Sequence, residues 1–553
     1  MIIQVFPMRF CVPVLSLSAA LLGLPISAQA IDNIPSGTQL WLQGITGVIP
    51  TAGFEIDGTL RFEAIDEPAD IGIQILSGEV TNAPTGTIIS ASGPGGWRYI
   101  EGSVLNEGAI QISSPVFDLP DSGAVLENHG IIDISPFTGL RMYGAGCLFD
   151  MEEGEVHVSS PTGYIHMQGG EFRYNGGIVD GTIIAYSSKV TVADRFTNNV
   201  NVQFVGPHCI YDGSLSINKL LTIDYEPRFG PVDLTLTNVE QLTGQIIFET
   251  TAADSPAVLN TSTNGLLVAN NGSITINDGL GSALIAGSLR VGGAVANLGM
   301  LRVSSPNAIT NSGQWTLGPN GLLTADASFV LDTGALHLGG GTVNAKGGLM
   351  NLGGTVDGSG TILGDVTNSG LISVTNSNPV SVTGNLNQEE AGSVTVNIMP
   401  GKSNAPAINM LGNLTLAGKL AIQSPSPLFP TNGQSYLLIT AGNISGGFSS
   451  AEFPNRPLGL QWHLQSDNHS VKLVALAGQP ALTLRAYVAT DSGNRTIEIA
   501  GALGANLLVQ RSPDLNHWTN IASFGTFGGY LRLPLDETNA TQSYYRADFL
   551  PAP

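Results

Sequence analysis

The residues best suited to chemistry lie between positions 150 and 195, where charges and rings gather in an otherwise weakly charged chain. The acids are Asp150, Glu152, Glu153, Glu155, Asp180 and Asp194, the bases are His157, His166, Arg173, Lys189 and Arg195, and the interleaved rings are Tyr164, Phe172, Tyr174 and Tyr186. A glycoside hydrolase needs two carboxyl groups ~5–9.5 Å apart. Aromatic faces beside acids could instead hold a sugar ring without catalysis. The third interpretation is a set of solvated faces and turns.

Other catalytic and metal-binding patterns do not occur in a suitable setting. The eight histidines show no H-E-x-x-H or paired spacing. A nucleophile elbow, a phosphate-binding loop and a dinucleotide fingerprint are also missing. Asp357–Gly360 is one partial copy of a calcium-binding β-roll repeat, which needs tandem copies. We therefore predict no catalytic, metal-binding or cofactor-binding residue and no cofactor.

Short β-strands must position these side chains. Apolar and polar residues alternate over Gly108–Ile112 and Gly130–Ile134, a period that places one side of a strand in a core and the other in water. The unit Asn-x-Gly followed by a strand recurs at Asn106, Asn128, Asn297, Asn311 and Asn368. Because Asn and Gly tolerate positive φ, we expect each unit to turn the chain sharply. The uneven spacing of the units predicts stacked coils of unequal length.

The repeats are clearest between Gly339 and Ile372, where Gly-Gly-Gly-Thr-Val, Gly-Gly-Thr-Val-Asp-Gly-Ser-Gly-Thr-Ile and Asn-Ser-Gly-Leu-Ile follow one another. These phrases resemble the β-helical passenger regions of bacterial autotransporters and filamentous adhesins. The resemblance implies an all-β fold with a right-handed parallel β-helix over residues 31–378. A series of β-sandwiches is the rival, but sandwiches favour regular aromatic core residues, and aromatic residues make up only 7% of the chain.

Two regions follow the predicted β-helix. Residues 379–476 contain Ser435–Gly442 and then Leu458–Trp462, an order similar to the closing segment of autotransporter passengers. We expect them to form terminal coils and a cap over the apolar edge of the solenoid. Residues 477–553 contain short strand-like segments and predict a small antiparallel β-sandwich. The Ser512–Trp518 segment looks like part of a module that ends large secreted bacterial surface proteins.

Residues 1–30 have the pattern of a signal peptide. Arg9 precedes the apolar run Cys11–Leu24, and Ala28–Ala30 fits the small-x-small cleavage pattern. The run is shorter than the ~20 residues of a spanning helix, and no later stretch reaches ~18 uninterrupted apolar residues. We therefore expect no integral membrane segment after signal cleavage, and a protein that is secreted or held at the cell surface.

Charge and cysteine content limit the partners further. The formal net charge is −22, and a polyanion of this size is repelled by nucleic acid and by anionic lipid surfaces. We expect no nucleic-acid partner, which leaves a polysaccharide or cell-surface partner. Export would permit a disulfide between Cys147 and Cys209, and the alternative is two buried thiols on different coils.

Three observations together favour a binding role. They are the repeated strand and turn phrases, the signal-peptide pattern, and the absence of catalytic motifs. We expect an exported structural or adhesive protein that presents an extended β-helical surface to glycans or cell-surface partners. The alternative is a β-helical polysaccharide lyase or glycoside hydrolase that uses acids of the 150–195 stretch.

Overall fold

Stacked parallel coils form a β-solenoid of about 16 turns, and small antiparallel sheets follow near the C-terminus. The computed structural model describes the chain apart from residues 1, 6–13, 19–30, 32, 44–46, 64–69, 94–95, 160–161, 194–199, 215–218, 250–255, 263, 278–281, 456–459, 478–482, 489–494, 501–505, 526–529, 536–542 and 551–553. Two compact units are distinguished: Met1–Phe329 with Ala345–Gly347, and Val330–Asn344 with Gly348–Pro553. The described residues contain no helix, and hence none long and apolar enough to cross a membrane. The predicted all-β fold of stacked parallel coils is confirmed.

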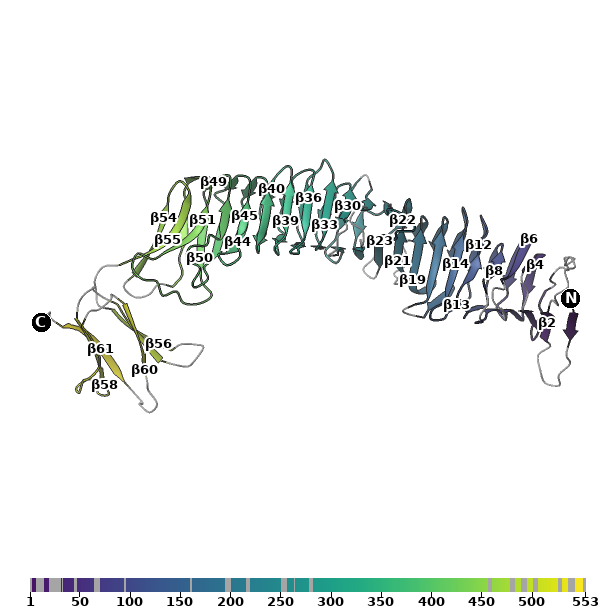
Figure 1. Cartoon of the computed structure of the whole chain (residues 1–553), viewed down its shortest axis with the longest axis horizontal. Helices are drawn as coiled ribbons and strands as arrows, with labels where there is room; N and C mark the ends of the chain where they lie inside the picture. The colour runs from purple at the N-terminus through teal and green to yellow at the C-terminus, as the bar shows by residue number, and fades with distance from the viewer. Residues whose placement is uncertain are drawn as a thin grey trace. The chain divides into compact units, whose positions relative to one another are not determined.

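Each coil in the middle of the first unit contains three strands. One coil has β14 (Gly139–Tyr143), β15 (Leu148–Met151) and β16 (Glu155–Val158), and the next has β17 (Tyr164–Gln168), β18 (Glu171–Tyr174) and the start of β19 (Ile178–Tyr186). Each strand pairs in parallel with its equivalent one coil later, as β14 does with β17 and β15 with β18. Figure 1 shows β8, β14 and β19 in this order along the stack of strands. Three ladders of strands result.

The three ladders are defined by their strands. The first ladder contains β8 (Arg98–Glu101), β11 (Phe117–Leu119), β14, β17, the end of β19, β21 (Val200–Val205), β23 (Leu220–Asp224) and β26 (Gln245–Glu249). The second contains β9 (Val104–Asn106), β12 (Val125–Asn128), β15, β18, β20 (Lys189–Val192), β22 (Cys209–Gly213) and β24 (Asp233–Thr237). The third contains β3 (Gln39–Gln43), β5 (Thr59–Glu63), β7 (Thr87–Ser90), β10 (Ala109–Ile112), β13 (Ile131–Ile134), β16 and the start of β19. Strands β4 (Gly47–Ile56) and β6 (Ile71–Asn82) precede the first and second ladders, and strands from β27 (Ala257–Asn260) to β36 (Leu322–Ala325) continue the unit.

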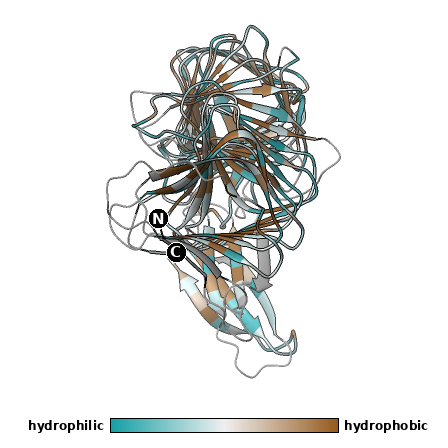
Figure 2. Ribbon diagram, turned by 90° about the vertical axis from the view of Figure 1, so that its right-hand side faces the viewer, coloured by the Kyte–Doolittle hydropathy of each residue, from teal (hydrophilic) through white to brown (hydrophobic). Residues whose placement is uncertain are grey.

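Side chains along these strands alternate between the core and the solvent, as the two-residue period predicts. In β15 and β18 every second residue is buried, and Figure 2 shows both hydrophobic and hydrophilic residues within the solenoid strands. Phe149 and Phe172 meet edge to face inside the coil, with ring centroids 5.2 Å apart. Phe172 and Tyr174 are therefore core residues, which removes both rings from the predicted patch.

The asparagines of three Asn-x-Gly units, Asn106, Asn128 and Asn368, belong to buried ladders. Nδ2 of Asn82 donates to Oδ1 of Asn106 at 2.6 Å, and Nδ2 of Asn106 donates to Oδ1 of Asn128 at 2.6 Å. In the second unit, Asn351 donates to Asn368 at 2.7 Å, and Asn368 donates to Gln388 Oε1 at 2.8 Å. Such stacks pair the buried amides with one another, and in the first unit they tie each coil to the next at the corner where the second ladder ends.

The prediction that the glycines of these units serve to adopt a positive φ is wrong. At Gly108, Gly130, Gly299, Gly313 and Gly370 the φ angle lies outside the left-handed range. A Cβ on Gly130 would instead overlap the carbonyl oxygen of Gly108 one coil earlier, and Gly313 has the same relation to Gly293. The close stacking of successive corners therefore requires glycine, rather than a positive φ.

Antiparallel strands end the parallel stacking in the second unit. Its coils contain β40 (Leu349–Asn351), β41 (Thr355–Asp357), β42 (Gly360–Leu363), β43 (Val366–Asn368), β44 (Leu371–Thr375), β45 (Val380–Val382), β46 (Leu386–Gln388), β47 (Ser393–Asn397), β48 (Ile408–Met410), β49 (Asn413–Leu416), β50 (Lys419–Gln423), β52 (Asn443–Gly446) and β53 (Ser450–Glu452). Strand β51 (Ser435–Thr440) pairs in parallel with β48 and antiparallel with β55 (Ser470–Ala477), which pairs antiparallel with β54 (Leu460–Ser466). A cap was predicted in this region, and its boundaries at residues 379–476 stay a prediction.

The C-terminal region contains two small antiparallel sheets. Strands β56 (Thr483–Val488), β57 (Arg495–Ala500) and β60 (Tyr530–Leu535) form one sheet, and β58 (Asn506–Ser512), β59 (Thr519–Phe524) and β61 (Tyr544–Leu550) form the other. Ile497 and Ile499 of the first sheet share a buried cluster with Leu507 and Val509 of the second. The predicted antiparallel sheets are confirmed, while the boundary at residue 477 stays a prediction.

The N-terminal and cysteine predictions have different outcomes. Most of the predicted signal peptide lies outside the described residues, which include only β1 (Ile2–Val5) and β2 (Val14–Ser18) within residues 1–30. Cys147 and Cys209 are free and buried, so the alternative of two buried thiols is confirmed. Burial raises the pKa of each thiol to about 11.

Candidate binding face

The structure distributes the residues of the 150–195 stretch over all three ladders. Asp150, Arg173 and Lys189 point outward from the second ladder, Tyr164, His166 and Tyr186 from the first, and Glu155, His157 and Asp180 from the third. Glu152 and Glu153 follow β15 in a turn, and Asp194 and Arg195 lie outside the described residues. The stretch is therefore not one site, and each ladder must be considered separately.

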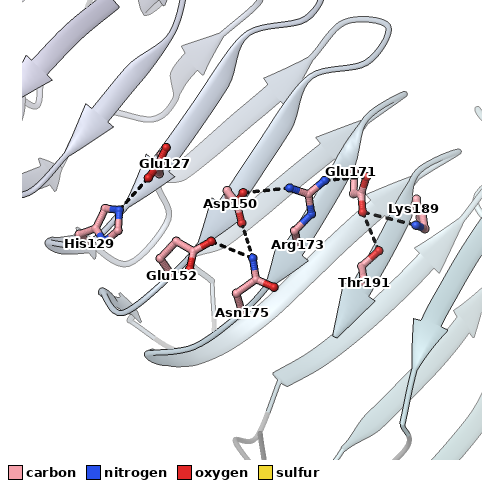
Figure 3. Close-up of polar contacts among 9 residues, drawn as sticks. All are labelled: Glu127, His129, Asp150, Glu152, Glu171, Arg173, Asn175, Lys189 and Thr191. Carbon is pink, nitrogen blue, oxygen red and sulfur yellow. Dashed lines mark hydrogen bonds and ion pairs between the residues drawn. The ribbon is translucent and has the colours of Figure 1, made fainter. Parts of the chain in front are cut away.

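Polar contacts hold the acids of the second ladder (Figure 3). Arg173 Nη1 donates to Asp150 Oδ2 at 3.0 Å. The Nδ2 of Asn175 donates to Asp150 Oδ1 at 3.0 Å and to Glu152 Oε1 at 2.9 Å. Burial raises the pKa of Asp150, and the charge of Arg173 opposes that rise. Both carboxylates have donors from the following coil.

The same network continues along the second ladder. Glu171 accepts the hydroxyl of Thr191 at 2.6 Å, and its carboxylate lies 3.5 Å from Lys189 Nζ. Lys189 also lies 3.2 Å from Asp212 Oδ2 one coil later. Acids and bases thus alternate from coil to coil, and exposed pairs of this kind contribute about 0–1 kcal/mol each. The arrangement connects neighbouring coils, and these carboxylates are already paired with donors of the protein.

The first ladder carries a row of outward rings, which we call the aromatic face. Its members on the strands are Tyr99, Arg141, Tyr143, Tyr164, His166 and Tyr186, and it also includes Trp97, which precedes β8, and Phe229, which lies in a turn after β23. The ring of Tyr99 lies against Gly72 one coil earlier, and that of Tyr164 lies against Gly139, since a Cβ on either glycine would overlap the ring. The glycines, which have no side chain, therefore let rings from the next coil lie directly over the preceding strand.

Arg141 lies between Trp97 and Tyr143. It donates to both carboxylate oxygens of Asp118, at 2.8 and 2.7 Å. Its guanidinium carbon lies 5.4 Å from the ring centroid of Trp97 and 5.8 Å from that of Tyr143, within the range of a cation–π contact. The Asp118 side chain is fully buried, so the charge of Arg141 is already paired and its flat surface supports the rings.

Three further contacts order the rest of the aromatic face. The ring centroids of Tyr164 and His166 are 4.2 Å apart, those of His166 and Tyr186 are 5.1 Å apart, and those of Tyr186 and Phe229 are 4.3 Å apart. Burial, with a smaller contribution from Arg141, lowers the pKa of His166 to about 4. His166 is therefore neutral at neutral pH and acts as one more aromatic ring.

Acids outnumber bases around the aromatic face. Glu101 ends β8 and accepts the Gln74 amide at 2.9 Å. Asp224 ends β23, and Glu249 lies beside it in register at the end of β26. Burial raises the pKa of Asp224, the hydrogen bond from Gln203 opposes that rise, and Glu249 adds to it. The described residues contain no group of three or more His, Cys, Asp and Glu side chains placed to hold a metal ion.

Five of the eight residues of this face lie outside the predicted 150–195 stretch. Tyr164, His166 and Tyr186 stood within the predicted stretch, but Trp97, Tyr99, Arg141, Tyr143 and Phe229 did not. The available signal was a pair of large flat side chains two residues apart, recurring as Trp97-x-Tyr99, Arg141-x-Tyr143 and Tyr164-x-His166. A two-residue spacing keeps both members on one side of a strand.

The fold and this face define a β-solenoid with outward-facing aromatic rings on one ladder. Comparison with protein-family models gives no match, and comparison with curated proteins gives none either. The chain is therefore characterised by its fold and by the chemistry of its surface.

Proposed function

We propose that this protein is an exported structural or adhesive protein whose solenoid surface binds glycans or cell-surface partners. The observation that supports binding is the aromatic face, where neighbouring coils hold several rings at the surface. The exposed side of such a ring gives a sugar a flat apolar contact, while tyrosine hydroxyl groups supply hydrogen bonds at its edge. Rings that are already held in place lose little conformational freedom on binding.

The proposal includes export to the cell surface or the medium. It is supported by the charge, apolar run and cleavage pattern of residues 1–30 and by the resemblance of the repeat phrases to autotransporter passengers. Expression of the full chain in a bacterial host should yield an exported protein whose sequence begins at Ile31. Retention in the cytoplasm with an intact N-terminus would contradict this part of the proposal.

Binding is tested by applying the labelled mature chain to an array of polysaccharides and to whole cells. We expect saturable binding to at least one of them. The control is a heat-denatured sample of the same protein, which has the same composition but lacks the folded surface. Binding of the folded chain to no glycan and to no cell surface would refute the adhesive function.

A carbohydrate-active enzyme is the second candidate, and the pairing of Asp224 with Glu249 favours it. Two carboxyl groups on adjacent coils, one with a raised pKa, are the arrangement expected of a general acid and its partner. If the protein releases reducing or unsaturated ends from a polysaccharide, Asp224→Asn and Glu249→Gln should each abolish that activity. Asp180→Asn, on the third ladder, should leave it unchanged. Activity that persists in both Asp224 and Glu249 variants would exclude this pair.

A further inference from the structure

We propose that the aromatic face binds an uncharged polysaccharide chain lying along the solenoid axis across several coils. This inference rests on the proposed binding function and names its ligand class and its residues. Three properties of the face support it: the direction of the row of rings, its length, and its charge.

The direction of the row follows from strand register. Strands β8, β11, β14, β17, β19, β21 and β23 are consecutive members of one parallel ladder. Trp97 lies beside β8, and Tyr143, Tyr164 and Tyr186 belong to β14, β17 and β19. The rings therefore lie on successive coils, except at β11, but in different register rows: Tyr164 pairs with Gly139, whereas Tyr143 and Tyr186 both pair with Gln168. They form a band that runs along the solenoid axis, and a linear chain lying on this band follows the same direction.

The length of the row favours a chain over a single sugar. From β8 to the end of β19 there are four steps along the ladder, and adjacent strands lie ~4.8 Å apart, so Trp97 and Tyr186 are separated by about 20 Å along the axis. A row of this length contacts several sugar rings at once. Each ring contact is weak alone, and contacts to one chain add in avidity. We therefore expect affinity to rise with oligosaccharide length.

The charge of the face selects against acidic polysaccharides. Arg141 lies among the rings and already donates two hydrogen bonds to Asp118, while Arg228, next to Phe229, lies 3.8 Å from Glu226. Glu101, Asp224 and Glu249 lie on the same ladder, and the whole chain carries a net charge of −22. A polyanion approaching this surface is repelled, whereas neutral hydroxyl groups can bond to tyrosine hydroxyls and acid oxygens.

The exposure of Trp97 makes it the best single probe. Its side chain is 52% exposed and precedes a strand rather than forming part of one, so Trp97→Ala should preserve the fold. Tyr186→Ala removes the last ring of the row that belongs to a strand, four steps along the ladder from β8. The control is Phe453→Ala, because Phe453 is also an exposed ring, at 41%, but belongs to the second unit.

The experiment measures affinity of the mature chain and these three variants for soluble polysaccharides by affinity electrophoresis and calorimetry. The probes are neutral glucomannan, xyloglucan and dextran, and acidic alginate and polygalacturonate. We expect binding to a neutral polymer, a loss of about tenfold or more in affinity for Trp97→Ala and for Tyr186→Ala, and no change for Phe453→Ala. We also expect affinity to be unchanged between about 50 and about 500 mM salt, because no charge pairing is involved.

Different failures identify different errors. Binding to glycans or cells that is equal in all variants would refute the aromatic face as the site and leave the adhesive function intact. Preferential, salt-sensitive binding of alginate or polygalacturonate would refute the neutral ligand class. Absence of binding to every polymer and every cell surface would refute both this inference and the adhesive function.

Discussion

Replacement of Asn106 by leucine tests whether the buried asparagine ladder stabilises the coils. Asn106 is fully buried, accepts from Asn82 and donates to Asn128, with both hydrogen bonds 2.6 Å long. In Asn106→Leu, the Asn128 oxygen loses this donor, while Asn82 keeps its 3.1 Å hydrogen bond to the Ala109 carbonyl. One orphaned acceptor and one weakened donor, at about 1–3 kcal/mol per unpaired buried group, predict a loss of about 2–4 kcal/mol.

Hydrogen exchange measured by mass spectrometry is the appropriate assay, because each coil contacts only its neighbours and opens locally. The expected loss corresponds to exchange about 30-fold to 1,000-fold faster in the coils around Asn106. The affected peptides should cover β9, β10, β12 and β13. Peptides of the second unit should exchange as in the unchanged protein.

Asn297→Leu is the matched control. Asn297 occupies the same Asn-x-Gly position and is equally buried, but neither of its side-chain polar atoms has a hydrogen-bond partner among the described residues. Its register neighbours are Ile276 and Leu317. Leucine there should leave exchange unchanged or slower. Equal acceleration in both variants, or less than about a fivefold change in Asn106→Leu, would refute the reasoning.

Three further predictions concern other buried contacts. Because the pKa of His166 falls to about 4 in the folded protein from ~6.5 in the unfolded chain, the stability from its neutral ring is present above pH 6.5 and is lost as the pH falls toward 4. Thermal unfolding should therefore show a loss of up to about 2 kcal/mol at pH 5 that His166→Phe does not show. Gly130→Ala should lower the melting temperature, because the added Cβ overlaps the backbone of the previous coil at a cost of about 1–3 kcal/mol. Gly447→Ala should leave the melting temperature unchanged, since nothing lies within 4 Å of its added Cβ. Equal melting temperatures of the two variants would contradict the stacking argument. Thiol reagents at pH 8 should label Cys147 and Cys209 at least about 100-fold faster after denaturation, since burial raises both thiol pKa values, and rapid labelling of the folded protein would refute this.

The fold class could be predicted from the sequence because β-strands show a local two-residue alternation of apolar and polar residues. Alternation over Gly108–Ile112 and Gly130–Ile134 became β10 and β13, and the Asn-x-Gly units fell at strand ends. The function of the glycines was not predictable in the same way. A positive φ is a property of one residue, whereas overlap between Gly130 and Gly108 depends on a coil 22 residues away.

The candidate site was only partly predictable for a related reason. The 150–195 stretch is contiguous in sequence, but a coil of three strands sends neighbouring segments to different sides. Asp118, Arg141 and His166 are 23 and 25 residues apart and lie in register on one ladder. Their proximity requires the number of residues in each coil, and that number varies from coil to coil.

This variation in coil length has a consequence for how the protein can change over generations. The asparagine ladder links residues 24 and then 22 positions apart in the first unit, and 17 and then 20 apart in the second. The turns between strands accommodate the different number of residues in each coil, so insertions in these turns should be tolerated during evolution. A whole coil can be duplicated or deleted without disturbing the rest, because the new corner again stacks amide on amide. Related chains should therefore differ in length by whole coils, with the corner sequence retained in each copy.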